Sequence, residues 1–390
     1  MQDDAFAAYD AQRARSAAIW VMDTAWTEAD LPQRRWVAPK YALRGAVTVI
    51  AGPPSAMKSS LMLAWGCAVA LGRQHGHFRP REPGKAVLYN VEDGADEQRR
   101  RLSAALRQFD ASPADIAGKV VCIGPLEAGM LFVDGDGEIL PTPLMARLRE
   151  IITERRPDLF VADPFAELHG LDENSNTGVR AVIAQFRALA VEFDMAVILV
   201  HHTRKGTLEP GDPEILRGGS AIVGGGRSIF TLLPMGEKDA EVLGSPTDRK
   251  SRSRFVRLDD AKLNYADIAE AVWYEKTLYT LGNDEIVPAA VPWKAPDIWQ
   301  AISTTVANKV LDEIDAGLDG GHRYSTAPSA TGRAAWRVVQ RHIPSFTEPQ
   351  ARAVIKTWLK NGVLVREDYQ DAAEGKKRQG VRVDNAKRPG

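Results

Sequence analysis

Cysteine, net charge and long apolar runs are all scarce in this chain, and each shortage excludes a class of protein. Only Cys67 and Cys122 occur, both inside apolar stretches, so a disulfide scaffold and a four-ligand zinc site are excluded. We expect two buried free thiols. Lys and Arg number 50 against 51 Asp and Glu, a formal net charge of −1, which excludes a polybasic coat protein and an acidic disordered chain. Any nucleic-acid-binding surface must therefore be local.

Membrane and export segments are also missing. The longest nearly apolar run, residues 61–72, is shorter than the roughly 20 helical residues that cross a bilayer. The chain opens with two aspartates and no basic region followed by an apolar one, so no secretion signal is predicted. We expect a soluble, cytoplasmic protein with no membrane partner.

The composition is that of a globular protein with several domains. At roughly 150 residues per domain, 390 residues correspond to two or three, and a hydrophobic content of 44% can fill their cores. Residues 1–40 contain Trp20, Trp26 and Trp36 in a weakly helical pattern that ends at Pro39. We interpret them as an N-terminal arm or packing helix.

From Ala46 onwards, short β-branched runs alternate with longer helical stretches. This pattern predicts a mostly parallel sheet buried on both faces, with strands at 46–50, 86–91, 120–123, 159–162 and 196–200. Later strands at 228–233, 254–258 and 273–281 alternate and lie closer together, which indicates an antiparallel extension of the same sheet. Residues 134–138 are interpreted as a hairpin turn, because a calcium loop would have glycine at its sixth position.

The proline-rich stretch 291–296 breaks the strand pattern and predicts a domain boundary. The expected organisation is an α/β domain at 41–290, a linker at 291–299, a second domain at 300–385 and a tail at 386–390.

Residues 52–59 read Gly-Pro-Pro-Ser-Ala-Met-Lys-Ser and lie between the first buried strand and an apolar helix. Phosphate binding at such a place needs backbone N–H groups at a helix N-terminus, a lysine for the β/γ oxygens and a hydroxyl for magnesium. Lys58 and Ser59 supply the last two, so ATP and Mg²⁺ are the expected cofactors. The expected nucleotide-binding residues are Gly52, Pro53, Pro54, Ser55, Ala56, Met57, Lys58, Ser59 and Ser60. The alternative is a strand-turn-helix that merely contains Lys-Ser.

Met57 stands where the second glycine of a P-loop is usual. Methionine keeps its N–H group but resists positive φ, at a cost of roughly 1–2 kcal/mol if the loop demands that conformation.

Acidic residues follow two of the predicted parallel strands. Glu92 and Asp93 come after the second strand, and Asp163 ends the fourth. The carboxyl ends of such strands form ligand sites, so we expect Glu92 to orient and deprotonate a water, Asp93 to cap the helix from Ala95, and Asp163 to hold magnesium through water. The alternatives are that Glu92 and Asp93 both cap that helix, and that Asp163 closes a turn before Pro164.

His201 and His202 end the fifth strand. Adjacent side chains diverge and no matching ligand cluster is visible, so metal binding is disfavoured. We expect His202 to be a neutral hydrogen-bonding sensor that links the phosphate site to the loop at 206–219; a purely structural histidine is the alternative.

Taken in order, these motifs resemble the RecA-like ATPases of the plasmid RepA helicase type, which are hexameric rings encoded by plasmids, phages and integrated elements. The resemblance covers about residues 30–285 and includes residues 217–221, Arg227 and residues 261–265. It implies that Lys58 and Ser59 bind phosphate and magnesium, Glu92 is the catalytic base, Asp163 the Walker B acid and His202 the sensor. It also implies that Arg227 is the arginine finger offered to a neighbouring subunit.

A finger is needed because charge grows on the transferring phosphoryl group, and a guanidinium can meet two oxygens at once. Arg227 follows three glycines and precedes an apolar strand. Arg217 and Lys205 are rivals, and Arg227 as a solvated side chain is the alternative. Lys262 is either a second cation for a neighbour's phosphate or a surface lysine.

The C-terminal residues predict a winged-helix domain. Thr347 and Gln350 form a capping-box pattern before a helix with a basic stripe at Arg352, Lys356 and Lys360. Strands at 363–366 and 380–383 flank a basic turn, and earlier helices are expected at 299–316 and 332–342. Residues 331–390 carry thirteen Lys and Arg against six Asp and Glu, a net +7, which leaves −8 for the remainder. The asymmetry favours phosphate contacts; a solvated basic face or a protein-docking domain is the alternative.

The sequence therefore predicts a RecA-like P-loop core with a C-terminal winged helix, assembled as a homo-oligomeric, hexameric DNA helicase or translocase. Its expected partners are single-stranded or forked DNA and a replication-initiation or primase protein. A DNA-binding ATPase that acts as a replication, regulatory or loading factor without unwinding is the first alternative, and a recombinase-like filament is the second.

Overall fold

The computed structural model describes most of the chain from Thr27 onwards. The described segments are residues 27–125, 128–135, 138–171, 176–203, 209–215, 219–243, 245, 247–265, 271–294, 302–327, 330, 332–370 and 375–389. Residues 1–26 of the expected arm lie outside them. A short 3₁₀ helix, η1 (Glu28–Asp30), comes first.

The end of the expected N-terminal arm is a strand rather than a helix. β1 (Trp36–Ala38) pairs antiparallel with β2 (Ala42–Leu43). Val37 and Ala38 are buried in the core that α2 (Lys58–Leu71) also joins. The prediction of an arm is corrected here, because Val37 and Ala38 belong to the same hydrophobic core as α2 and the sheet strands.

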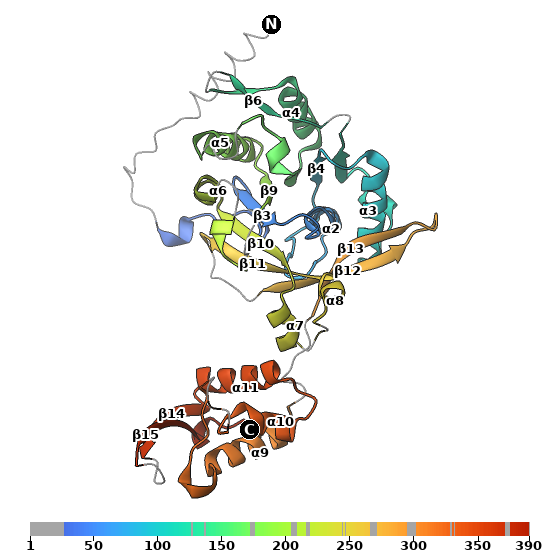
Figure 1. Ribbon diagram of the computed structural model, residues 1–390. Helices are drawn as coiled ribbons and strands as arrows, with labels where there is room; N and C mark the ends of the chain where they lie inside the picture. Colours follow the sequence, from blue (N-terminus) through green and yellow to red (C-terminus); the bar gives the residue numbers. More distant parts are fainter. Residues whose placement is uncertain are drawn as a thin grey trace. The chain divides into compact units, whose positions relative to one another are not determined.

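A nine-stranded sheet organises residues 47–293 (Figure 1). Its order is β13-β12-β11-β10-β3-β9-β8-β4-β5, and all neighbours from β10 to β5 are parallel. The five predicted parallel strands are confirmed. The strands are β3 (Val47–Gly52), β4 (Ala86–Asn90), β5 (Val120–Ile123), β8 (Leu159–Asp163), β9 (Ala196–His202), β10 (Ser228–Pro234), β11 (Phe255–Leu263), β12 (Val272–Thr280) and β13 (Ile286–Trp293).

The antiparallel extension differs from the prediction at both ends. It starts one strand later, because β10 is parallel to β3 and only β11 runs antiparallel to β10. It ends one strand later, with β13, whose last three residues (291–293) were expected as the start of the linker. Pro288 and Pro292 are compatible with β13 because it is an edge strand, the place in a sheet where proline is tolerated.

Helices cover both faces of the sheet. α2 and α3 (Ala95–Arg107) pack on one face, where Ile50 and Leu88 point. α4 (Pro143–Arg155), α5 (Asn176–Glu192) and α6 (Gly219–Gly225) pack on the other, where Val49 and Val87 point. Alternate residues of one strand thus enter two different cores, which explains the nearly continuous apolar runs in the sequence.

The apolar run 61–72 is the core helix α2, whose residues 61–70 are buried on all sides. None of the helices in the described ranges is long and apolar enough to cross a membrane. Cys67 is buried and Cys122 partly buried, both thiols are free, and burial raises the pKa of each to about 12.

Shorter elements connect these layers. The predicted hairpin is confirmed by β6 (Phe132–Gly135) and β7 (Glu138–Pro141), although its turn at 136–137 lies outside the described residues. The others are η2 (Pro113–Ile116), η3 (Phe165–Glu167), η4 (Pro213–Ile215), α7 (Glu237–Leu243) and α8 (Arg249–Arg252).

The C-terminal residues have a hydrophobic core of their own. Three helices, α9 (Thr304–Ala316), α10 (Trp336–His342) and α11 (Glu348–Lys360), precede an antiparallel pair, β14 (Leu364–Gln370) and β15 (Lys377–Val383). η6 (Asp319–Gly321) and η7 (Asn385–Lys387) are short 3₁₀ turns. The capping box is confirmed, because Thr347 N–H donates to Gln350 Oε1 at 2.8 Å and Gln350 N–H to Thr347 Oγ1 at 3.4 Å.

Candidate active site

The predicted phosphate loop lies where β3 meets α2. β3 ends at Gly52, the loop covers residues 53–57, and Lys58, Ser59 and Ser60 form the first turn of the helix. The N-cap residue Met57 makes no side-chain cap, and the first N–H groups of a helix have no partner within it. These N–H groups, at the positive end of the helix dipole, are the donors that an anion requires.

Two residues of the loop adopt positive φ without being glycine. Ser55 has φ +64° and Met57 has φ +59°. The loop therefore does demand of Met57 the conformation that glycine usually supplies. Gly52 is required for another reason: a Cβ there would lie 2.3 Å from the carbonyl oxygen of Leu232 in β10.

The Lys58 ammonium group is held at the mouth of this loop. Its Nζ donates to the carbonyl oxygens of Gly52 and Pro53, each at 2.9 Å, and lies 3.4 Å from Nδ1 of His202. Burial lowers the pKa of Lys58 to about 8, against the opposing charges of Asp163 and Glu92. A phosphate that replaced the carbonyl contacts would stabilise the charged form.

Asp163 ends β8 two strands away from β3 and is 5% exposed. Burial raises the pKa of its carboxyl to about 6, although a hydrogen bond from Ser59 and the charge of Lys58 oppose the rise. A cavity of about 20 Å³, lined by Ser59, Asn90, Asp93 and Asp163 among others, lies beside it and has room for one water. The three predicted residues Lys58, Ser59 and Asp163 therefore meet.

The turn after β4 is organised by Asn90, a residue that sequence reasoning missed. Its buried Oδ1 accepts from the backbone N–H groups of Glu92 (2.9 Å) and Asp93 (2.6 Å). Glu92 is exposed at this turn, close enough for its charge to act on Lys58 and Asp163. The signal was available, because asparagine often bonds the backbone two residues on and so fixes a turn.

Asp93 does not cap α3, and the prediction that it does is wrong. The N-cap residue is Gly94, and the Asp93 carboxylate instead lies 2.7 Å from Arg101 Nη1. Gln98 Nε2 donates to the Asp93 carbonyl at 2.7 Å. Asp93 is thus committed to α3, whereas the Glu92 side chain faces the solvent at the site.

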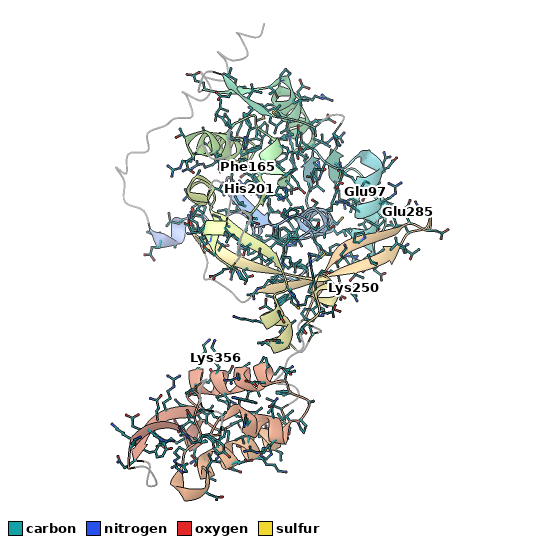
Figure 2. All side chains as sticks on the ribbon, viewed as in Figure 1. Glu97, Phe165, His201, Lys250, Glu285 and Lys356 are labelled. Carbon is teal, nitrogen blue, oxygen red and sulfur yellow. The ribbon has the colours of Figure 1, made fainter. Side chains whose placement is uncertain are left out.

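The two histidines at the end of β9 are placed differently. His202 pairs in register with Gly52 and contacts Lys58, whereas His201 is buried with its ring 5.7 Å from that of Phe165 (Figure 2). His202 therefore belongs to the phosphate site and His201 to the core. Of the loop at 206–219 to which His202 was expected to connect, residues 206–208 and 216–218 lie outside the described residues.

The family comparison agrees with this geometry. The AAA_25 family model, described as an AAA domain, matches residues 11–207, half of the chain. The chain belongs to the AAA_25 family. It is a P-loop, nucleotide-binding ATPase of the AAA/RecA-like class, and the match spans Lys58, Glu92, Asp163 and His202 but ends before Arg227.

Magnesium fits the residues of this AAA domain. Ser59 offers a hydroxyl, and the buried, hydrogen-bonded Asp163 offers a carboxylate whose negative charge burial disfavours and a cation would stabilise. In the described part of the chain no cluster of three or more His, Cys, Asp or Glu could hold a metal. The ion would accordingly depend on Ser59, Asp163 and the phosphates of the nucleotide, and would neutralise charge on those phosphates.

Arg227 lies at the end of the parallel strands opposite the phosphate loop, which we call the Arg227 edge. Its N–H donates to the Val47 carbonyl at 2.8 Å, and β10 then runs parallel to β3 with Ser228 opposite Thr48. Val47 is five residues before Gly52, which at 3.3 Å per residue is about 16 Å along the strand. The exposed Arg227 side chain therefore cannot complete the site of its own subunit.

Lys262 lies beside Arg227 at this edge. Its Nζ donates to the carbonyl oxygens of Val223 (2.6 Å) and Gly226 (3.1 Å), and burial together with the Arg227 charge lowers its pKa. The structure thus places side by side Arg227 and Lys262, the two cationic residues that the sequence analysis named as candidates in this region. The rivals Arg217 and Lys205 lie outside the described residues.

Proposed function

We propose that this AAA-domain ATPase is a ring-forming, ATP-dependent DNA helicase or translocase of the plasmid RepA type, acting in replication of a plasmid, phage or integrated element. The observation that carries the proposal is the pair Arg227 and Lys262 at the sheet edge opposite the phosphate loop. Cations in such a place are of use to ATP hydrolysis only in a neighbouring subunit. A closed ring, hexameric by the resemblance, gives every site such a neighbour.

Within one site, the roles follow from the positions. Lys58 would bind the β/γ oxygens, and Glu92 would accept a proton from the attacking water, being exposed at the site and free of the pairing that holds Asp93. His202, beside Lys58, would sense the phosphate. Arg227 of the adjacent subunit would stabilise the charge that grows on the transferring phosphoryl group.

The C-terminal module supports a DNA partner. The order of three helices and a hairpin is that of a winged helix, and α11 would be its recognition helix. Lys356 and Lys360 are exposed, and Lys356 points away from α9 and α10 (Figure 2). Arg352 lies over the Trp336 ring at 5.0 Å and pairs with Glu348, so the lysines are the better phosphate contacts. A replication-initiation or primase protein is proposed as a further partner.

A second candidate is a DNA-bound regulatory or loading factor that hydrolyses ATP without unwinding. The charge distribution favours it, because residues 331–390 carry +7 and the remainder −8, which concentrates DNA contact on the module. Strand displacement from a forked duplex separates the two candidates. An open filament in negative-stain images with an ATP analogue and single-stranded DNA would instead indicate the recombinase-like arrangement.

The decisive experiment mixes two inactive variants. The Arg227→Ala subunit keeps a functional phosphate loop but has no arginine finger for its neighbour. The Lys58→Ala subunit has an inactive phosphate loop and keeps its arginine finger. In an equimolar mixture about a quarter of the interfaces pair a working loop with a working finger, and a trans finger is worth roughly 10³–10⁵ in rate. The steady-state ATPase rate should therefore rise to as much as about a quarter of the wild-type rate.

The matched control mixes Glu92→Gln with Lys58→Ala. Both changes damage the same site, so no interface is repaired and the rate should stay at that of the pure variants. Native mass spectrometry confirms mixed assemblies in both cases. A flat profile for the Arg227 mixture despite confirmed mixing would reject the trans role and remove the main reason to expect a ring.

A further inference from the structure

A second pocket rich in arginine lies away from the phosphate loop. It has a volume of about 460 Å³, and α3, the start of η2 and the loop between β12 and β13 bound it. Figure 2 labels Glu97 on α3 and Glu285 at the end of the β12–β13 hairpin, which locate two of these elements. The polar lining residues are Arg99, Arg100, Ser103, Arg107, Ser112 and Asn283.

The helical lining comes from one face of α3. At 100° per residue, Arg99, Ser103, Arg107 and Arg100 fall within a sector of about 100°. Their donors therefore converge on one volume. The other sides of α3 pack against the core of α2 and against Val287 and Ala289 of β13, so the arginines project from a fixed support.

The positive charge of the pocket is only partly compensated by carboxylates. No carboxylate is among its lining residues, and Asp284 and Glu285 of the same hairpin loop do not line it. Arg99 and Arg100 contact Asp96 and Glu97, at 3.0 and 3.6 Å, within their own helix. Within the described part of the chain, Arg107 has no carboxylate partner.

We propose that this pocket binds a compact anion with at least two phosphate groups, such as free polyphosphate or the polyphosphate part of a nucleotide, independently of the phosphate loop. Guanidinium groups match phosphate oxygens in pairs, and the amide group of Asn283 adds a further donor. The volume lies within the usual range of small-molecule sites, about 300–1,000 Å³, and exceeds what a single phosphate fills.

A single-stranded nucleic acid suits the pocket less well. Such strands are normally held by aromatic side chains on which successive bases stack. The apolar lining here is aliphatic, with Ala111, Pro113 and Leu281. A compact polyanion needs no such platform.

The test measures binding of tripolyphosphate, without magnesium, by calorimetry on the full-length Lys58→Ala protein, in which the phosphate loop lacks its lysine. Adding Arg100→Glu and Arg107→Glu should weaken binding at least tenfold. Arg99→Glu, at a side chain that is 77% exposed, should weaken it about threefold or more. Inorganic monophosphate should bind more weakly than tripolyphosphate.

The matched control is Arg155→Glu in the same background, a charge reversal at an exposed arginine of α4 that does not line the pocket. It should leave the affinity within about twofold. Equal weakening by Arg155→Glu, or no binding to the Lys58→Ala protein, would overturn the site. The proposal of a compact ligand would be overturned if a ten-nucleotide oligothymidylate displaced tripolyphosphate at lower concentration and its binding depended on Arg100 and Arg107 in the same way. ATP binding by the Arg100→Glu/Arg107→Glu protein with Lys58 intact shows that the fold is retained.

Discussion

Met57, the N-cap residue of α2, is in the left-handed conformation, with φ +59° and ψ +19°, where the P-loop pattern usually has glycine. Left-handed backbone costs an L-residue roughly 1–2 kcal/mol, and Ser55, two residues earlier, also has a positive φ, of +64°. The loop that binds phosphate is therefore strained at two positions, and the strain is local enough to be measured one residue at a time.

Glycine should be better than alanine at both positions. Met57→Gly and Met57→Ala remove the same packing against the α2 core, and Ser55 is exposed, so each Gly–Ala comparison isolates the backbone. We expect the glycine variant to be more stable by about 1 kcal/mol at each position, by denaturant unfolding. In an ordinary helical position alanine is favoured by a similar amount, so that order at Ser55 or Met57 would contradict the assignment of strain.

Nucleotide binding should be strongest between about pH 6 and pH 8. Binding with magnesium requires Asp163 ionised and Lys58 protonated, and burial places their pKa values at about 6 and about 8. Below the first value Asp163 carries a proton that binding must release, and above the second Lys58 lacks a proton that binding must restore, so Kd rises on both sides. Titrations of Mg²⁺ and an ATP analogue from pH 5 to 9.5 measure this.

The Asp163→Asn variant distinguishes the protein's contribution to that pH dependence from the ligand's. The analogue has its own phosphate titration near pH 6, which remains in the variant. The additional weakening of the wild type below pH 6 should disappear in Asp163→Asn, at a lower overall affinity. An unchanged acidic limb would mean that Asp163 does not titrate with binding.

At the scale of single elements, the turn between β4 and α3 places two neighbouring carboxylates, Glu92 and Asp93, in different surroundings. Asn90 fixes the turn through two backbone hydrogen bonds, Asp93 pairs with Arg101, and Glu92 is left at the site. Arg101 also pairs with Glu97 at 2.8 Å, so Asp93 is part of a charged network along α3.

Substitutions at the two carboxylates should therefore differ in kind. Glu92→Gln should bind ATP with magnesium while lowering kcat by at least a hundredfold, because only the base is lost. Asp93→Asn should leave kcat within about threefold and instead weaken the contact between the turn and Arg101. Nucleotide binding and steady-state turnover of both variants measure the split. Turnover stopped by Asp93→Asn and spared by Glu92→Gln would assign the base to Asp93.

The elements that sequence could predict are those whose signal is local. Buried parallel strands show as β-branched runs, and the α11 capping box as Thr347 with Gln350, and all of these are confirmed. β13 was missed because its prolines indicate a break unless one knows that the strand lies at an edge. Asp93 was assigned to capping because its partner Arg101 acts from two turns into the helix. The proximity of Arg227 and Lys262 depends on the register of β10 with β11, which no local pattern contains.

For the whole molecule, the separation between the phosphate loop and the Arg227 edge is the feature with the widest consequence. In the proposed ring, each subunit would carry half of two sites, one at each end of the parallel strands. An assembly built on this plan couples every hydrolysis to a contact between neighbours. If the C-terminal module of the same chain binds DNA phosphates, that coupling would produce movement along the DNA strand.

The proposed binding of DNA by the C-terminal module can be tested through the salt dependence of that binding. Lys356 and Lys360 are exposed on α11, and each lysine that neutralises a phosphate releases a counterion, so log K falls with log[salt] with a slope of about −0.9 per contact on duplex DNA. The double variant Lys356→Ala/Lys360→Ala should therefore weaken binding to a forked duplex and make the slope shallower by about 1.8.

Lys309→Ala, at an exposed lysine on α9, is the control and should leave the slope unchanged. ATPase activity without DNA should be the same in all three proteins, because neither lysine of α11 belongs to the phosphate site. If the slope is unaffected by the double variant while unwinding is lost, α11 contacts a protein and not DNA, and the strand must be held by the ATPase ring alone.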